Sequence, residues 1–560
     1  MNSKTYPSTR YLPFGDTAIL VELGDTINAE LNKKVLCLSE TIEKAEIAGL
    51  EEVVPTYRSL LVRYDPLETT YEQLAFRIED VEKTLKPMSG KAKRKTVIVP
   101  VVYGEEYGPD LAFVAQSHGL TEEEVIELHS DREYRVYMIG FVAGFPYLGE
   151  VPDEIAAPRL ETPRLKVPAG SVGIAEKQTG IYPCEAPGGW RIIGRTPLKL
   201  FNPHEQPPTV TKPGDNVKFK PISKEEFKAF KQQELQEPKR EPKDEMNLFK
   251  VAKSGLFTTV QDIGRYGYLK YGVPISGAMD TFSFVAANLL VKNPLNSACL
   301  ETTLIGPELQ ALKKTQIAVT GGEIPIDING HKASMWQTIE VQESDVISFG
   351  KTESGCRAYM SIKGGINTPQ VLRSRSTYVR GGFGGIDGRQ LRSGDIIKGF
   401  PTISLERSYA FPEEFIPKYT DFHKICVVLG PQADMFTEKG IETFLTSEYT
   451  ITSEADRMGY RLEGPNTEYR AKAEVISDPL LPGAMQIPPN GKPIVIMRDA
   501  QTTGGYPKIA VAITPDISLL GQAKPSDKIK FSKITTHEAH KKTIAHYGFL
   551  SNLKNMLIKA

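Results

Sequence analysis

The feature that most constrains the fold of this chain is a charged stretch near its middle, residues 224–245 (KEEFKAFKQQELQEPKREPKDE). It holds charges of both signs, few apolar residues and two prolines close to its end. Such a segment cannot bury enough apolar surface to fold by itself, so we expect a short exposed helix followed by a flexible linker. Because a new globular pattern begins at once at Met246, the sequence predicts two folded halves joined end to end.

Length and composition set the class of protein. The 560 residues are too many for one hydrophobic core, and we expect about three or four domains. With 40% hydrophobic and 24% charged residues, the composition is that of a soluble globular protein. A formal net charge of −1 gives no general attraction to nucleic acid or to an anionic membrane, and we expect neither as a partner.

The cysteines and the apolar runs indicate the compartment. No apolar run approaches the roughly 18–20 residues of a membrane helix, and residues 1–15 lack the apolar core of a signal peptide. Five cysteines lie far apart without a CxxC pair: Cys37, Cys184, Cys299, Cys356 and Cys426. This spacing argues against a disulfide framework and fits a reducing cytoplasm, with the thiols as buried bystanders rather than catalytic groups.

The first half begins with alternating strand and helix signals. Apolar runs predict three strands, at residues 18–23, 59–64 and 95–102. Apolar residues at helical spacing predict two helices, one over 29–48 capped by Asn28 and one starting at Thr69 or Thr70. These elements predict a small α/β domain that ends in a basic linker at residues 87–95.

The rest of the chain is richer in β-strand signals. Residues 108–130 predict two short helices, and residues 134–220 alternate strand-like runs with Gly/Pro turns at the spacing of an all-β barrel. The second half is β-rich, with one helix predicted at Asp280–Leu290, a polar break near Leu405–Lys418 and a terminal helix over 536–557. The fold class we expect is mainly β with α+β parts. The predicted domains are 1–92 (α/β), 93–222 (barrel), 223–245 (linker), 246–405 (first β domain of the second half), 406–535 (second barrel) and 536–560 (helical tail).

A polar hinge in the second half is the first candidate site. Two apolar runs, Pro493–Met497 and Ile509–Ile513, flank the segment Arg498-Asp499-Ala500-Gln501-Thr502-Thr503-Gly504-Gly505-Tyr506-Pro507. It is either a polar turn or a binding loop whose glycines let backbone N–H groups approach a ligand. The segment Gln178–Pro183 (QTGIYP) repeats the order Gln, Thr, Gly, Tyr, Pro in the first half, which favours the binding loop.

Several other motifs admit a structural and a functional reading. The glycine-rich run Arg380–Arg389 can cradle an anion or simply link two strands. Asp262 with Arg265, and Asp456 with Arg457, form a structural ion pair or an anion site. No Walker or GxSxG motif occurs, so the nucleotide site stays unknown. No metal site is expected, because His537 and His540 have no evident third ligand, and among the scattered histidines His129 is the one to examine.

Long motifs in both halves resemble a known family. Residues 140–150 (GFVAGFPYLGE) and 163–198 resemble the B subunit of 5-oxoprolinase and the allophanate hydrolase subunit 1 family. Residues 255–280, 300–309, 455–464 and 482–507 resemble the C subunit of 5-oxoprolinase and the biotin-dependent carboxyltransferase-like (allophanate hydrolase subunit 2) family. The sequence departs from the family pattern at Ala143 and at Asp478-Pro479. The resemblance implies cyclophilin-like β-barrels after a small N-terminal α/β domain.

The resemblance also implies a function. Family members open 5-oxoproline to glutamate at the expense of ATP, together with a separate A subunit, so a small amide substrate, ATP with Mg²⁺ and that partner are expected. A homo-oligomer is compatible with the sequence. This chain has no Met-Lys-Met biotin attachment site, and a complete urea carboxylase is therefore not expected. Two alternatives stay open: a regulatory protein that binds a sensor histidine kinase, and an amide-processing enzyme of the urea or allophanate type.

The polar residues of these motifs are the candidate site. The predicted catalytic residues are Asp262, Arg265, Arg457 and Asp499. The predicted substrate-binding residues are Gln178, Thr179, Tyr182, Arg195, Arg498, Gln501, Thr503 and Tyr506. In this hypothesis Arg498 or Arg457 clamps a phosphate or the substrate carboxylate, and Asp262 or Asp499 acts as a base or holds Mg²⁺. Both polar loops are expected to face a shared cleft.

Overall fold

The structure is a computed structural model that describes residues 8–85, 95–233, 245–402, 407–471 and 473–559. Most of the basic linker predicted at 87–95, the flexible part of the linker after residue 233, and part of the break near 405–418 lie outside the described residues. The predicted helix at the start of the central linker is present as α5 (Lys224–Gln233). None of the helices in the described ranges is both long and apolar enough to cross a membrane.

The N-terminal domain is a four-stranded antiparallel sheet covered by two helices. Its strands run in the order β1 (Arg10–Pro13), β2 (Ala18–Glu22), β4 (Ser59–Tyr64) and β3 (Leu50–Pro55). Helices α1 (Ala29–Lys44) and α2 (Tyr71–Lys83) bury Val35, Leu38 and Ile78 against one face of the sheet. The cap predicted at Asn28 is present, and α1 ends at Lys44 rather than at residue 48. The second helix was predicted to start at Thr69 or Thr70, and Thr70 is its N-cap. Strands β1 and β3 were not predicted, and the strand predicted at 95–102 belongs to the next domain.

A closed barrel follows, as the turn spacing predicted. Its strands are β10 (Gln178–Ile181), β7 (Pro146–Gly149), β6 (Glu133–Ile139), β13 (Asn216–Pro221), β5 (Thr96–Tyr103), β12 (Arg191–Arg195) and β9 (Ser171–Ala175). Helices α3 (Leu111–His118) and α4 (Glu122–Ser130) and a two-stranded antiparallel sheet of β8 (Arg164–Val167) with β11 (Ala186–Gly188) are attached to it. Aliphatic side chains such as Val99, Val136 and Ile174 fill its core.

The second half begins with two facing sheets. The first has the order β20 (His331–Ala333), β19 (Ile326–Ile328), β22 (Val346–Phe349), β17 (Glu308–Ala311), β14 (Met246–Lys253) and β24 (Ile396–Gly399). The second has the order β15 (Phe257–Gln261), β16 (Cys299–Thr303), β23 (Ser354–Ile362), β18 (Thr315–Glu323) and β21 (Thr338–Val341). The predicted helix is present as α6 (Thr281–Leu290), with Asp280 as its N-cap.

A second closed barrel ends the chain. Its strands are β26 (Phe422–Leu429), β33 (Lys508–Ala512), β30 (Ala484–Gln486), β31 (Ile494–Ile496), β28 (Gly459–Glu463), β27 (Glu448–Ile451) and β34 (Lys528–Lys533). Helices α7 (Glu438–Thr446), α8 (Thr514–Gln522) and α9 (Thr536–Met556) and the short pairs β25 (Tyr409–Ala410) with β35 (Ile558–Lys559) and β29 (Asp478–Pro479) with β32 (Thr503–Gly504) complete it. In each barrel the first strand pairs in parallel with the last, β5 with β13 and β26 with β34, which indicates related topologies.

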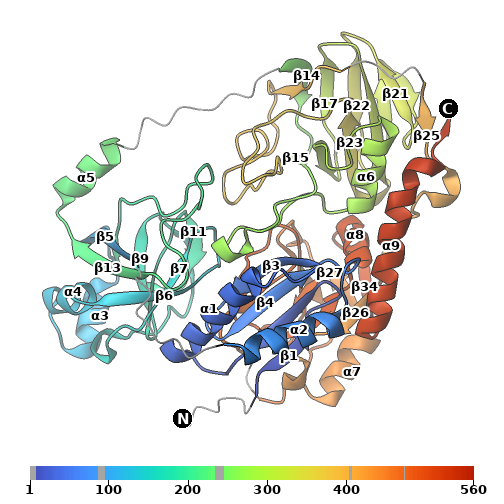
Figure 1. Cartoon of the computed structure of the whole chain (residues 1–560). Helices are drawn as coiled ribbons and strands as arrows, with labels where there is room; N and C mark the ends of the chain where they lie inside the picture. The colour runs from blue at the N-terminus through green and yellow to red at the C-terminus, as the bar shows by residue number, and fades with distance from the viewer. Residues whose placement is uncertain (1–7, 86–94, 234–244, 403–406, 472, 560) are drawn as a thin grey trace.

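The N-terminal sheet joins the two halves, because its second face packs on the C-terminal barrel. Leu20 and Leu61 of the sheet share a core with Ile496 and Val511 of that barrel. Figure 1 shows this sheet (blue) lying across the second barrel, with the first barrel beside it and α9 (red) along the opposite side of the molecule. The expected fold class, mainly β with an N-terminal α/β domain and barrels, is confirmed. The individual domain boundaries remain predictions.

Candidate functional site

The two halves meet where the loop after β6 touches the polar hinge. The Phe141 amide donates a hydrogen bond of 2.9 Å to the Thr503 hydroxyl. Gly140 is in such close contact with Thr503 that a Cβ at this position would lie 2.5 Å from its methyl carbon. A glycine is therefore required here because the hinge of the second half approaches the loop of the first half directly.

The QTGIYP segment of the first half and the polar hinge of the second half both lie next to Tyr147. In the first barrel, Gly180 of β10 pairs with Tyr147 of β7. Burial raises the pKa of Tyr147, while hydrogen bonds with Thr503 and Ser477 oppose that shift. Tyr147 thus contacts the hinge of one half and the QTGIYP strand of the other, so these segments lie on the same side of the junction.

Tyr57 of the N-terminal domain also reaches this junction. Its ring centre lies 5.8 Å from that of Tyr147, and its side chain is 1% exposed. Burial raises the pKa of its hydroxyl well above the usual value, and the nearby Gln178 amide opposes that rise. Within the described residues the Tyr57 oxygen has no partner at hydrogen-bond geometry. The Tyr57 hydroxyl therefore lies buried beside Gln178 at this junction.

Two first-half residues serve the core of the first barrel. The Thr179 hydroxyl donates to the Gly173 carbonyl at 3.0 Å, so His129 Nε2–H must donate to Thr179, 3.0 Å away. The other ring nitrogen, Nδ1, then accepts from the Tyr103 hydroxyl at 2.8 Å. Burial lowers the pKa of His129 to about 3, so the ring is neutral. His129 and Thr179 form a satisfied core pair, and the Thr179 side chain does not face the hinge.

The other predicted binding residues occupy different surroundings. Tyr182 is buried among aromatic rings, with its ring centre 5.2 Å from that of Phe145. Arg195 lies over the Tyr107 ring at 5.5 Å, on another part of the barrel. Tyr506 is 38% exposed and Gln501 is half-buried. The hinge contact with the first half is therefore carried by Thr503, through its hydrogen bond with Phe141.

Arg457 is the centre of a buried hydrogen-bonded network. Its guanidinium holds the Asp499 carboxylate in a bidentate pair (2.8 and 3.1 Å) and also donates to Glu301 and to the Gly277 carbonyl. Burial works against its charge, but Asp499 and Glu301 raise the pKa of Arg457 above its usual value. These bonds use four of the five guanidinium N–H groups, so little of Arg457 is left for the substrate anion that the sequence hypothesis gave it. Glu301 was missed from the sequence, although it lies in the family motif at 300–309.

Asp262 and Arg265 lie next to this network. The Asp262 carboxylate accepts from the hydroxyls of Ser374 and Ser376 and from the amides of Gly264 and Arg375. With four donors around it, Asp262 orders the turn and is not open to a metal or a substrate proton in this structure.

Arg265 is 1% exposed and lies over the Phe383 ring. It donates to the carbonyls of Val371 and Ser376, and its Nη1 has no partner among the described residues. Burial lowers the pKa of Arg265 to about 10, while Asp262 and Asp499 oppose that shift. Arg265 thus lies within electrostatic reach of Asp499, and it keeps a buried donor that can meet an anion.

The glycine-rich loop faces the first half. Arg380 donates to the Met458 sulfur, and its charge opposes the rise that burial causes in the pKa of Cys184. Phe383 of the same loop shares an apolar cluster with Ala143 and Tyr378. The loop thus closes one side of the junction.

The network around Arg457 and Asp499 is connected to the junction by hinge residues 499–503. Arg498 points elsewhere, with Nη2 donating to Thr281 at the start of α6 at 3.0 Å. The structure therefore brings Asp262, Arg265, Arg457 and Asp499 together and places Thr503 against the first half. Tyr57, Tyr147 and Asp478 were not among the predicted site residues. Tyr147 lies in the family motif at 140–150 and Asp478 is a departure from the family pattern, whereas no sequence signal marked Tyr57.

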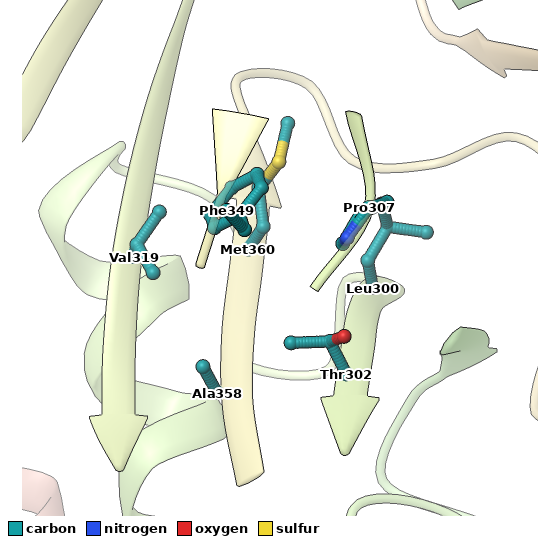
Figure 2. Close-up of a pocket in the computed structure, with 7 residues that line it drawn as sticks. All are labelled: Leu300, Thr302, Pro307, Val319, Phe349, Ala358 and Met360. Atoms are coloured by element: carbon teal, nitrogen blue, oxygen red, sulfur yellow. The ribbon is translucent and has the colours of Figure 1, made fainter. Parts of the chain in front are cut away.

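The residues at the junction do not fit a Mg²⁺–nucleotide. The described residues contain no group of three His, Cys, Asp or Glu side chains placed to hold a metal ion. Asp262 is already engaged by four N–H and hydroxyl donors, and the Asp499 carboxylate is held by the Arg457 guanidinium. An internal cavity of about 10 Å³ in the first β domain of the second half has an apolar lining, including Leu300, Val319 and Met360, and is too small for a substrate (Figure 2).

Comparison with known proteins assigns both halves. Residues 9–211 match the carboxyltransferase domain, subdomains C and D, and residues 271–533 match its subdomains A and B. Over 229 residues, 39% of this chain and 95% of the relative, the chain is 44% identical to the B subunit of 5-oxoprolinase from Bacillus subtilis. It is 33% identical to the C subunit of 5-oxoprolinase from Escherichia coli over 294 residues, 52% of this chain and 94% of the relative. The chain belongs to the family of the 5-oxoprolinase B and C subunits.

In this family the chain is a fusion of a B-like first half and a C-like second half. The same fold occurs in a solved structure, that of TTHA0988, which is 30% identical and superposes with a TM-score of 0.79 over 92% of this chain and 99% of that one. About half of the chain also resembles urea amidolyase of Saccharomyces cerevisiae, at 33% identity over 51% of this chain and 17% of the relative.

Proposed function

We propose that this fused chain supplies the B and C components of an ATP-dependent 5-oxoprolinase, and that a separate A-like protein completes the enzyme. The reaction opens 5-oxoproline to L-glutamate while ATP is hydrolysed to ADP and phosphate. The observation that carries the proposal is that the B-like and C-like motifs, each 5-oxoprolinase-like in sequence, contact each other at Phe141 and Thr503. A fusion keeps these loops together.

The chemistry assigns binding and orientation to this chain. A lactam is a poor electrophile, so its opening near neutral pH needs activation and close positioning of water. Because the junction does not fit a Mg²⁺–nucleotide, we assign nucleotide binding to the partner and derive no step through it. A reactive lactam at the junction would be held by hydrogen bonds from Thr503, Tyr147 and Tyr57, with Gln178 beside Tyr57.

Arg265 and Asp499 are the residues we assign to charge and proton handling. In this proposal Nη1 of Arg265, which has no partner among the described residues, binds the substrate carboxylate or the oxyanion that forms on ring opening. Asp499 uses only part of its acceptor capacity on Arg457 and can take a proton from water as the ring opens. Arg457 then acts as the fixed counter-charge of Asp499.

A urea-type activity is the second candidate, since about half of the chain resembles urea amidolyase. Both candidates are tested by purifying the chain with its A-like partner and measuring ATP turnover with 5-oxoproline, urea and allophanate. We expect glutamate release with 5-oxoproline. Turnover with urea alone would favour the second candidate, and turnover with none of the three would contradict both.

The site assignment has its own test in the same assay. Asp499→Ala and Arg265→Ala should each abolish most glutamate release while the variant still binds its partner. If either variant kept full ATP-dependent release, its assigned role would be wrong.

A further inference from the structure

A buried charged cluster lies directly behind the polar hinge, and we call it the Asp478 cluster. Asp478 is 0% exposed and accepts hydrogen bonds from Arg58 Nη2 (3.1 Å), Ser59 Oγ (2.8 Å) and Gln432 Nε2 (3.1 Å). The Lys508 ammonium, also 0% exposed, lies 3.8 Å from the same carboxylate. The cluster therefore combines groups of the N-terminal sheet with groups of the C-terminal barrel.

The cluster touches both ends of the segment that carries Thr503. At one end, Asp478 and Pro479 pair with Gly504 and Thr503 as two short antiparallel strands. At the other end, the backbone amide of Lys508 donates to the Gln432 side chain at 3.2 Å. Since Gln432 also donates to Asp478, the residues between 503 and 508 are held at both ends by one carboxylate and its partners.

Arg58 links this arrangement to the other half of the chain. It pairs with Glu22 at 3.1 Å and donates to the Gly24 carbonyl at 2.8 Å, which fixes it in the N-terminal sheet. Two acids, Glu22 and Asp478, face two buried bases, Arg58 and Lys508, and the partly exposed Arg10 lies 3.5 Å from Glu22. Removing one member of such a cluster leaves an uncompensated buried charge and loosens what it holds.

We propose that Arg58 and Asp478 are positioning residues, through which the N-terminal sheet fixes the 503–508 segment for substrate binding. The substrate role rests on the proposed function, whereas the positioning itself does not. Arg58 and Asp478 touch neither the lactam nor the reacting atoms; they act through Thr503. The N-terminal domain thereby contributes to a site whose hinge belongs to the opposite end of the chain.

Hydrogen exchange of the intact chain tests the positioning. In Arg58→Met we expect amide exchange within residues 503–508 to be about tenfold faster, because a charge-assisted bond to Asp478 is lost. The matched control is Arg63→Met, a buried arginine of β4, the strand that begins directly after Arg58, and it pairs with Glu51 and Glu52 instead. It should leave exchange in 503–508 unchanged. Equal exchange in this segment for wild type and Arg58→Met would overturn the inference.

A milder variant keeps the test decisive if Arg58→Met does not fold. Ser59→Ala removes one hydrogen bond to Asp478 and no charge, and should speed exchange in the same segment by a few-fold. No change in a folded Ser59→Ala protein would contradict the inference. In the assay with the partner protein, we expect a raised KM for 5-oxoproline in Arg58→Met with a smaller change in kcat. Faster exchange with unchanged KM would contradict the substrate role of the hinge and leave the positioning standing.

Discussion

Two buried arginines show how pairing decides which side chains can act. Arg457 directs its guanidinium to Asp499, Glu301 and Gly277, whereas Arg265 keeps one donor atom without a partner among the described residues. Both arginines occur in family motifs, and the sequence could not rank them. The hydrogen bonds indicate that Arg457 is the structural partner of Asp499 and that Arg265 is the better candidate for an anion.

Arg457→Met should therefore be strongly destabilising. The substitution leaves two buried carboxylates, Asp499 and Glu301, without their cation, which typically costs about 3–5 kcal/mol. Arg498→Met is the control, because Arg498 is half-buried and its loss removes one hydrogen bond to Thr281, worth about 1 kcal/mol. Urea unfolding of both variants measures the difference. Equal stabilities would show that the Arg457 network contributes little.

His129 should make the first barrel sensitive to acid. Its pKa is about 3 when folded and about 6.5 when unfolded, so between these values only the unfolded chain binds the extra proton. The free energy of unfolding should thus fall as pH drops through this window, by about 2 kcal/mol between pH 7 and 5. His129→Gln should remove this dependence from the exchange of core amides in β9 and β10. His118→Gln, an exposed histidine, should retain it.

Substitution by alanine should have opposite effects at two glycines, one in a loop and one in a helix. In the loop after β6, Gly140→Ala places a methyl group against Thr503 and should separate the two halves at this point. We expect the folded variant to lose at least about tenfold in glutamate release with the partner protein, since small displacements of positioning groups are costly. Unchanged release would show that this contact is not part of the site.

In α9, Gly548 is exposed and a Cβ would meet nothing within 4 Å. Gly548→Ala should raise the stability of the chain by about 0.5–1 kcal/mol, because alanine has the higher helix propensity. Thermal unfolding measures this gain. It also serves as the methyl-adding control for Gly140→Ala, because it should leave glutamate release unchanged.

Across the molecule as a whole, local patterns predicted the architecture well. The apolar runs at 493–497 and 509–513 are strands of one barrel, although each pairs with β30 and not with the other. The charged stretch after residue 223 predicted two halves, and the cap at Asn28 and the helical spacing after Thr69 or Thr70 predicted two helix starts. These features depend on neighbours in sequence, which is why they could be predicted.

The buried polar networks could not be predicted in the same way. Arg58 meets Asp478 across 420 positions, and Arg457 meets Glu301 across 156. Such pairs depend on how the N-terminal sheet and the two facing sheets pack against the C-terminal barrel, which no local pattern encodes. For the same reason Thr179 and Thr503, which occupy similar QT-containing motifs, differ in surroundings: one bonds inside a barrel core and the other bonds across the junction.

The proposed function depends on the substrate binding where the two halves meet. The decisive measurement is hydrogen exchange of the intact chain with its partner, with and without 5-oxoproline and with ATP withheld. We predict that 5-oxoproline protects amides in both halves, within residues 140–149 and 499–508. Protection confined to one half, or absent from both of these segments, would contradict binding at the junction.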